Sequence, residues 1–196
     1  MSRTAAIHRK TAETDICLSL TLDCQEPSEI NTGIGFLDHM LTLLARHGFM
    51  KLDVKAEGDL DVDSHHTAED IGIVLGQALK EALGDKAGIR RYGTMTLPMD
   101  DTLMLCALDL SGRPWLNMDV RFTVPRLGTL DSEMIREFFY AVAVHAGMNL
   151  HFVQMAGENN HHIAEAMFKA FGQALDMAVT IDPRIQGVRS SKGSLE

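Results

Sequence analysis

The sequence has few cysteines, no long apolar run and no excess of positive charge, and each of these absences excludes a class of protein. No run of about 18 apolar residues occurs, so we expect no membrane-spanning helix. The N-terminal segment MSRTAAIHRKTAETD has no apolar core of the signal-peptide type, which argues against secretion. The three cysteines, Cys17, Cys24 and Cys106, form no CxxC motif, and they predict reduced thiols in a cytoplasmic protein.

The net charge of −9 argues against nucleic acid as a partner, because a phosphate backbone is bound by clustered basic residues. A small phosphorylated ligand is not excluded, since a few local arginine and lysine side chains are enough to bind one. The hydrophobic fraction of 45% and the charged fraction of 23% are typical of a soluble globular protein.

What the chain does have is an internal repeat. The segment HHTAEDIGIVLGQAL (65–79) recurs as HHIAEAMFKAFGQAL (161–175), a shift of 96 residues with eight of fifteen positions identical. A weaker match at a shift of 98 residues aligns His39 with Glu137 and His47 with His145. A repeat on this scale in a chain of 196 residues indicates that one half-domain occurs twice.

Both halves have nearly the same predicted order of elements, with one extra strand in the second. In the first half the residue pattern predicts strands over 4–10, 14–23 and 51–58, and helices over 35–48 and 64–84. In the second half it predicts strands over 91–101, 102–112, 115–122 and 148–157, and helices over 131–147 and 160–179. The expected helix caps are Asp63 or Ser64 in the first half and Asp131 or Ser132 in the second.

The predicted fold class is α+β, with an internally duplicated half-domain and four helices packed between two sheets. We expect the first half-domain over residues 1–86 and the second over residues 87–182. A polar tail follows over residues 183–196.

Adjacent histidines begin both repeated helices, and a glutamate follows the first histidine of each pair by four residues. That spacing puts the first histidine and the glutamate on one face of the helix. The second histidine is rotated by about 100° from the first, so the two rings are expected to serve different ions. The positive end of the helix dipole disfavours imidazolium and favours the neutral ring that a metal needs.

Five imidazoles and three carboxylates are the candidate ligands of two metal ions. Mixed nitrogen and oxygen ligation without thiolate suits Mn²⁺, Fe²⁺, Co²⁺ or Zn²⁺. The first predicted set is His65, Glu69, Glu137 and His162, and its symmetry mate is His161, Glu165, His39 and His66. Different subunits can contribute to one set. A single histidine pair at a helix start is more often a capping or surface feature, but two copies with glutamate at the same offset favour metal binding.

Motifs along nearly the whole chain resemble those of imidazoleglycerol-phosphate dehydratases. They are GFLDHML (35–41), DSHHTAEDIG (63–72), RYG (91–93), PMDD (98–101), SGRP (111–114), EFF (137–139), NLH (149–151), NNHHIAEAMFKA (159–170) and SSKG (190–193). The resemblance implies a ribosomal protein S5 domain 2-like fold and a dehydration in histidine biosynthesis. It further implies two Mn²⁺ ions per active site and a homo-oligomer of 24 subunits with sites at their interfaces.

The resemblance also implies roles for individual residues. The eight candidate ligands fall on the family's metal positions, although many members have histidine where this chain has Glu137. Glu13 matches a catalytic acid/base, and Asp100 matches an acid near the substrate ring. Two further departures are Leu43, where members carry glutamine, and Arg189, where proline is usual. The matching phosphate-binding positions are Arg91, Arg113, Lys169, Ser190 and Lys192.

The substrate implied by the resemblance is an imidazole ring with a dihydroxypropyl phosphate, D-erythro-imidazole glycerol phosphate, and the product is imidazole acetol phosphate. The proton to be removed lies on a carbon with no neighbouring carbonyl, so it is hardly acidic. Two metal ions would stabilise the imidazolate that expels the hydroxyl. Glu13 would then transfer a proton, a contribution typically worth about 10²–10⁴ in rate. Guanidinium groups and the tail, closing over the ligand, would hold the phosphate.

Simpler interpretations stay open for several of these residues. Glu13 could be an exposed strand carboxylate, and Arg91 and Arg113 could pair with nearby aspartates. Lys169 follows Glu165 by four residues, so a helical salt bridge would also explain it. Two competing functions are a binuclear metallohydrolase acting on a phosphate ester and a non-enzymatic metal-storage or assembly protein.

Overall fold

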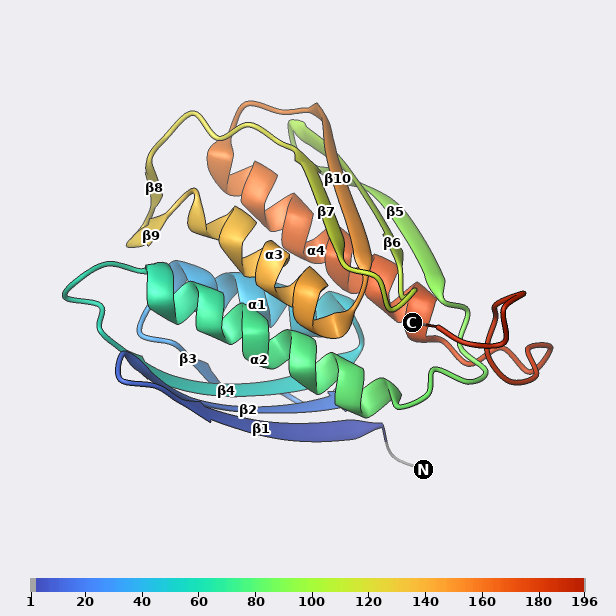
Figure 1. Ribbon diagram of the computed structural model, residues 1–196. Coiled ribbons are helices and arrows are strands. Elements are labelled where there is room, and N and C mark those ends of the chain that lie inside the picture. The colour runs from blue at the N-terminus through green and yellow to red at the C-terminus, as the bar shows by residue number, and fades with distance from the viewer. Residues whose placement is uncertain (1–2, 196) are drawn as a thin grey trace.

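The computed structural model describes residues 3–195, and their elements form two layers of sheet with the helices between them (Figure 1). The first sheet has the strand order β1-β2-β4-β3 and the second the order β5-β6-β10-β7. Helices α1 and α2 cover the first sheet, and α3 and α4 cover the second. The predicted α+β fold with a duplicated half-domain is thereby confirmed.

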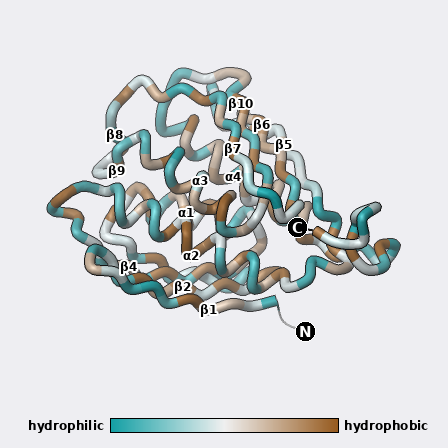
Figure 2. The backbone as a smooth tube through the Cα atoms, in the orientation of Figure 1, coloured by the Kyte–Doolittle hydropathy of each residue, from teal (hydrophilic) through white to brown (hydrophobic). Residues whose placement is uncertain are grey.

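In the first half, β1 (Thr4–Lys10) and β2 (Thr14–Leu22) form an antiparallel hairpin, with His8 opposite Cys17. The helix α1 (Gly35–His47) leads into β4 (Met50–Gly58), which pairs with β2, and α2 (His65–Leu83) follows. Buried residues alternate along β2 from Thr14 to Leu22, so one face of the strand lies against the helices. The same alternation of hydrophobic and hydrophilic residues is visible along the strands in Figure 2.

The second half repeats this order. It comprises β5 (Tyr92–Met99), β6 (Thr102–Asp109), β7 (Trp115–Asp119), α3 (Met134–Ala146), β10 (Asn149–Ala156) and α4 (Asn160–Val179). A small hairpin of β8 (Arg126–Leu127) and β9 (Leu130–Asp131) precedes α3. The chain after α4 runs beside the start of β5, where Ile89 and Ile181 form an isolated bridge.

Two expectations from the sequence were wrong in detail. The first half also has a fourth strand, β3 (Ile30–Asn31), which pairs in parallel with β4 as β7 pairs with β10. Two residues are too short a run for any periodicity to reveal. The helix α3 is capped by neither predicted residue, because Asp131 accepts hydrogen bonds from Ser64 and Arg126, and Ser132 donates to the carbonyl of Val124.

The core lies between the sheets and includes a cluster of five phenylalanines from α3, β10 and α4. Phe139 is at its centre, with ring centroids 4.7 Å from Phe152 and 4.8 Å from Phe168. The other members are Phe138 and Phe171. Among the described residues, no helix is long and apolar enough to cross a membrane.

The repeated Gly-Gln-Ala-Leu segment has a packing explanation. Gly76 and Gly172 are its two glycines, and each lies where a neighbouring helix crosses closely. A Cβ atom on Gly76 would be 2.7 Å from Cβ of His145 on α3, and one on Gly172 would be 2.8 Å from the carbonyl oxygen of Leu44 on α1. Only glycine allows both crossings without displacement of the helices.

Candidate functional site

The two histidine pairs occupy the first turns of α2 and α4, as the sequence predicted. The Asp63 carboxylate accepts a hydrogen bond from the backbone N–H of His65 at 2.7 Å. In α4 the Asn159 side chain is the cap, and it accepts from the N–H groups of His161 and His162 at 2.9 and 3.3 Å. The cap fixes the backbone that carries the second pair.

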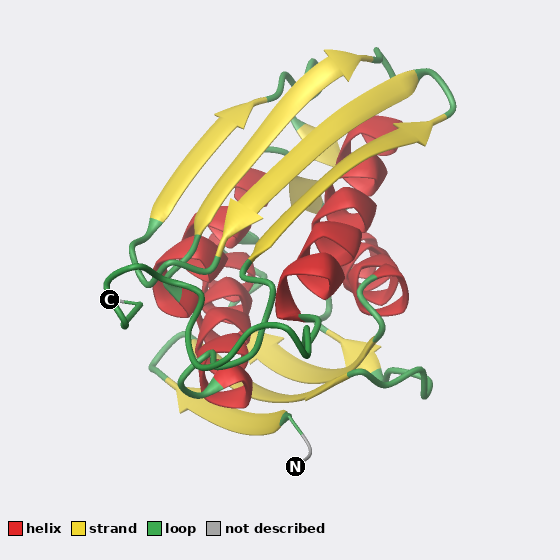
Figure 3. Ribbon diagram, turned by 90° about the vertical axis from the view of Figure 1, so that its right-hand side faces the viewer, coloured by secondary structure: helices red, strands yellow, loops and turns green. Residues whose placement is uncertain are grey.

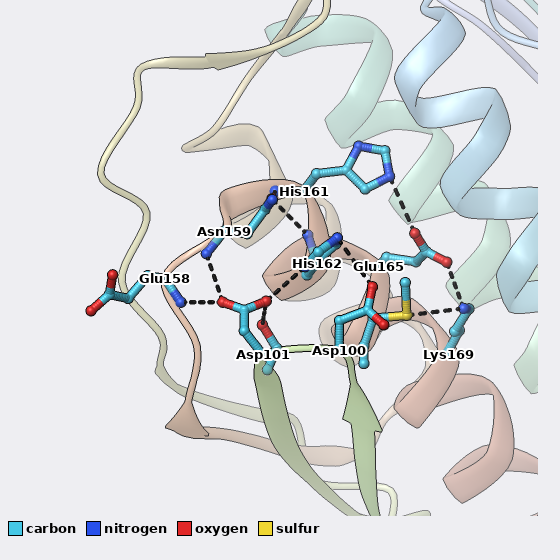
Figure 4. A network of polar contacts seen from close by, with 10 residues as sticks. Asp100, Asp101, Glu158, Asn159, His161, His162, Glu165 and Lys169 are labelled. Atoms are coloured by element: carbon cyan, nitrogen blue, oxygen red, sulfur yellow. Dashed lines mark hydrogen bonds and ion pairs between the residues drawn. The ribbon is translucent and has the colours of Figure 1, made fainter.

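The structure brings together three of the candidate ligands, His39, His161 and Glu165. One nitrogen or oxygen atom from each side chain lies within 4.8 Å of the others. His39 comes from α1, and the packing of α1 against α4 delivers it to the histidine pair. His161 Nε2 is 3.2 Å from Glu165 Oε2, as Figure 4 shows. Two imidazoles and a carboxylate at this separation are a donor set that fits a divalent transition metal.

Glu165 is the buried member of this group, and Lys169 holds it in place. Lys169 Nζ lies 2.5 Å from Glu165 Oε1, one helical turn further along α4 (Figure 4). Burial alone would raise the pKa of Glu165, but the hydrogen bond and charge of Lys169 outweigh burial, and the pKa lies below its ordinary value. The carboxylate is therefore ionised at neutral pH. Lys169 belongs to this group and forms the helical salt bridge that the sequence left open.

The second predicted set of ligands is less closely assembled within one chain than the group formed by His39, His161 and Glu165. His65 Nε2 lies 3.8 Å from Glu69 Oε2 across one turn of α2, and both side chains are 42% exposed. Glu137 is in the first turn of α3, the helix that packs along α2. Three of the four predicted members therefore lie on two adjacent helices, and His162 lies on α4.

The second histidine of each pair faces acids of its own half. His66 Nδ1 is 3.0 Å from Asp59 and 3.8 Å from Glu13, which lies in the turn between β1 and β2. The hydrogen bond to Asp59 raises the pKa of His66. In the second half, His162 contacts Asp100 and Asp101, which form the equivalent turn between β5 and β6. The two predicted acids, Glu13 and Asp100, thus occupy corresponding turns of the duplicated fold.

Four of the five predicted phosphate-binding residues line one pocket of about 300 Å³ at the other end of the molecule. They are Arg91, Arg113, Ser190 and Lys192. Arg91 is fixed by a two-point contact with Asp109 at 2.6 and 2.9 Å, and that contact raises its pKa. A third nitrogen of Arg91 donates to the carbonyl oxygen of Arg189 at 2.9 Å, so the side chain also anchors the tail.

The histidine pairs lie at the starts of α2 and α4, whereas the pocket is lined by Arg91 and by the C-terminal segment, which lies beyond the other end of α4 in Figure 1. The backbone N–H of Arg91 donates to the carbonyl of Ala178, at the end of α4, whereas His161 is in its first turn. At about 1.5 Å of rise per residue, the 17 residues between His161 and Ala178 separate the two ends by about 25 Å. Figure 3 looks onto the pocket end, where the C-terminal segment crosses.

A second group of metal-ligand types lies on the outer face of the first sheet. His8, Asp15 and Cys17 each have one potential ligand atom within 4.8 Å of the others, on the neighbouring strands β1 and β2. Lys10 Nζ already contacts Asp15 at 2.5 Å, and a thiol is a poor ligand for a hard ion such as Mn²⁺. A shallow groove of about 710 Å³ runs along the same face.

Sequence reasoning missed the side chains that hold the predicted residues in place. Asp59, Asp101, Asp109 and Asn159 each bind a candidate residue directly. Asn159 could have been found, since asparagine immediately before a helix is a common cap. The three aspartates have no local pattern, because their partners lie 7, 61 and 18 residues away in the sequence.

The sequence and the fold of this chain are similar to those of known proteins. The family model described as imidazoleglycerol-phosphate dehydratase matches residues 32–175. Proteins of that name from Lachnoclostridium phytofermentans and Streptococcus thermophilus are 64% and 62% identical, and the matches cover 100% and 98% of this chain and all of theirs. The crystal structure from Staphylococcus aureus has a TM-score of 0.83 at 44% identity, covering 91% of this chain and 99% of that one. That from Pyrococcus furiosus has a TM-score of 0.84 at 38% identity, covering 96% and 100%.

The duplicated α+β fold and these relatives define an enzyme of the dehydratase class. The chain belongs to the imidazoleglycerol-phosphate dehydratase family, as the motif resemblance predicted.

Proposed function

We propose that the chain dehydrates imidazoleglycerol phosphate in histidine biosynthesis, with two divalent metal ions, Mn²⁺ in the first instance, at each active site. The observation that carries the proposal is the group formed by His39, His161 and Glu165, since α1 and α4 bring three candidate ligands within 4.8 Å of one another. Family membership supplies the reaction. The expected location is the cytoplasm, with no membrane or nucleic-acid partner.

His39, His161 and Glu165 would hold one ion, with His66 of another copy of the chain as the fourth ligand. His65, Glu69 and Glu137 would hold the other, together with His162 of another copy. When bound, the ions would supply positive charge that stabilises electron density on the substrate's imidazole ring. The chain's own contribution is to keep Glu165 ionised through Lys169 and to present the imidazoles from the first turns of α2 and α4.

The phosphate would be held at the pocket of Arg91, Arg113, Ser190 and Lys192. Guanidinium groups can contact two phosphate oxygens at once, and Asp109 keeps that of Arg91 oriented. The tail, residues 183–196, would then be a substrate-contacting segment that follows the half-domains 1–86 and 87–182. Lys169 already forms an ion pair with Glu165, so it could help to bind the phosphate only while it also contacts this proposed metal ligand.

The separation of about 25 Å along α4 is far longer than a three-carbon phosphate side chain. One chain therefore cannot offer its own histidines and its own phosphate pocket to one substrate molecule. A complete site would combine the histidine end of one copy with the pocket end of another. This supports a homo-oligomer with active sites at interfaces, for which we propose the 24-subunit shell.

Glu13 and Asp100 are exposed carboxylates in corresponding hairpin turns, each near the second histidine of a pair. Exposure in a rigid turn suits a group that must meet a substrate and move a proton. We propose Glu13 as the acid/base that takes the proton from carbon, and Asp100 as an acid beside the ring. The backbone N–H of Asp59 donates to the carbonyl of Glu13 at 3.1 Å, which restrains the turn.

A product assay tests the proposal against its two competitors. The purified protein with Mn²⁺ should convert the substrate to a ketone without release of inorganic phosphate. Phosphate release would instead identify a metallohydrolase. Glu13→Gln should keep metal and assembly but lose turnover, whereas Glu57→Gln, an exposed glutamate on β4, should behave as the unmodified protein. Full turnover by the Glu13→Gln protein would refute the assigned proton transfer.

A further inference from the structure

The second histidine of each pair binds a carboxylate through the same ring atom. His162 Nδ1 lies 2.6 Å from Asp101 Oδ1, and His66 Nδ1 lies 3.0 Å from Asp59 Oδ2. Asp59 follows β4, whereas Asp101 lies in the turn between β5 and β6, so the two aspartates come from different positions of the repeat. Each half nevertheless has a contact between an aspartate and Nδ1 of the second histidine, and Figure 4 shows that of the second half.

Asp101 is tied to the backbone that leads into α4. Its Oδ2 atom accepts hydrogen bonds from the N–H groups of Glu158 and Asn159 at 2.7 and 3.0 Å (Figure 4). These two bonds, followed by that of His162, hold the pKa of Asp101 well below its usual range. One carboxylate thus fixes both the start of the helix and the ring that the helix presents.

A carboxylate can only accept a hydrogen bond, so its contact with Nδ1 requires the ring proton to be on that nitrogen. The lone pair is then on Nε2, the atom available to a metal. Carboxylates that orient ligand histidines in this way typically strengthen metal binding by about 10–100-fold. On the Nε2 side, Asp100 lies 3.4 Å from His162, a longer contact that a metal ion would replace.

We propose that Asp101 and Asp59 are positioning residues that set the tautomer of His162 and His66 and so present Nε2 to the metal ions. The proposal rests on the proposed function, because it needs these histidines to be ligands. It adds two residues that touch neither metal nor substrate.

The structure makes an unusually specific prediction for Asp101→Asn. Two backbone N–H groups face the position of Oδ2, so the amide oxygen must occupy that position. The amide NH₂ group then faces His162 Nδ1 and donates to it. The ring proton moves to Nε2, which blocks the ligand atom, although the side chain has kept its size.

The test is a titration of Mn²⁺ into chelator-treated protein, followed by electron paramagnetic resonance. Asp101→Asn should bind Mn²⁺ about 10–100-fold more weakly than the unmodified protein. Asp59→Ala, which removes the acceptor of His66, should also weaken binding. Asp53→Asn is the matched control, because Asp53 accepts from the backbone N–H of Glu29 but contacts no histidine, and its affinity should be unchanged.

Circular dichroism of each variant separates lost positioning from lost folding. If Asp101→Asn does not fold, Asp59→Ala decides the proposal by the same measurement. A folded variant with unchanged Mn²⁺ affinity would overturn the positioning role and leave the proposed function intact. Failure of the unmodified protein to bind Mn²⁺ would overturn the proposed function itself.

Discussion

Two inactive variants of this chain should restore each other's activity when they assemble into one particle. His161→Ala removes a proposed ligand at the histidine end, and Lys192→Ala removes a cation at the pocket end. If each active site combines the two ends from different copies, some sites in a mixed particle receive an intact end from each variant. With random mixing of equal amounts, about one quarter of the sites are complete.

The expected fraction follows from the proposed division of each site between two copies. A complete site needs a histidine end from a Lys192→Ala copy and a pocket end from a His161→Ala copy, and each choice has even odds. Co-expression with two different affinity tags, followed by purification on both, isolates the mixed particles. Ketone formation per particle should then recover to about one quarter of the unmodified rate, against background for either variant alone.

The control uses two variants from the same end. His39 and His161 belong to one group within one chain, so a mixture of His39→Ala and His161→Ala offers no intact group. Its activity should stay at background. Recovery in this control, or no recovery in the first mixture despite verified mixing, would refute the inference that a site spans copies.

Three further predictions concern packing, pH and phosphate binding. Gly93→Ala should lower the free energy of unfolding by about 1–3 kcal/mol or more, because a Cβ atom there would be 1.8 Å from the carbonyl oxygen of Ala174. A urea titration measures the change. The control is Gly35→Ala, whose Cβ would meet nothing within 4 Å and which should leave the free energy of unfolding unchanged. Burial, and next to it nearby cations, lower the pKa of His47 and of His145 below the ordinary value of 6.5. As the pH falls, these histidines take up protons in the unfolded chain before they do so in the folded one, so the free energy of unfolding decreases below about pH 6.5. The double variant His47→Gln/His145→Gln should therefore show a smaller loss of stability than the unmodified protein between about pH 7 and 5, the range in which histidines of an unfolded chain protonate. Thermal melts in the presence of a chelator measure this difference. Asp109→Asn should raise KM for the phosphorylated substrate more than it lowers kcat in steady-state assays, because Arg91 loses its two-point support.

The duplication is the part of the fold that the sequence predicted best. The identity between residues 65–79 and 161–175 located the start of α2 to the residue and the start of α4 within one residue. Periodicity failed for β3, because two residues cannot display a period. The residue pattern before α3 also gave the wrong caps. Asp131 and Ser132 are residue types that often cap helices, but here their side chains bind other partners.

The candidate site was predictable in its residue types more than in its arrangement. The pattern of histidine and glutamate on one helix predicted that His161 and Glu165 would meet, and the structure has them 3.2 Å apart. That His39 joins them depends on how α1 crosses α4, which single-sequence patterns do not specify. The contacts of Asp59 and Asp101 with these histidines depend on how the loop after β4 and the β5–β6 turn lie against the helix starts, so no local spacing could have revealed them.

The direction of the helices explains why the two ends differ in chemistry. Within residues 3–195 all four helices begin at the histidine end, so their positive dipole ends gather there (Figure 1). A carboxylate is favoured at such an end, and Glu137 lies in the first turn of α3. The pocket end receives the negative ends of the same helices, where an anion is disfavoured and no helix N-terminus can bind it. The proposed phosphate would therefore have to be held there by side-chain cations, and this is where the fold brings Arg91, Arg113 and Lys192 together.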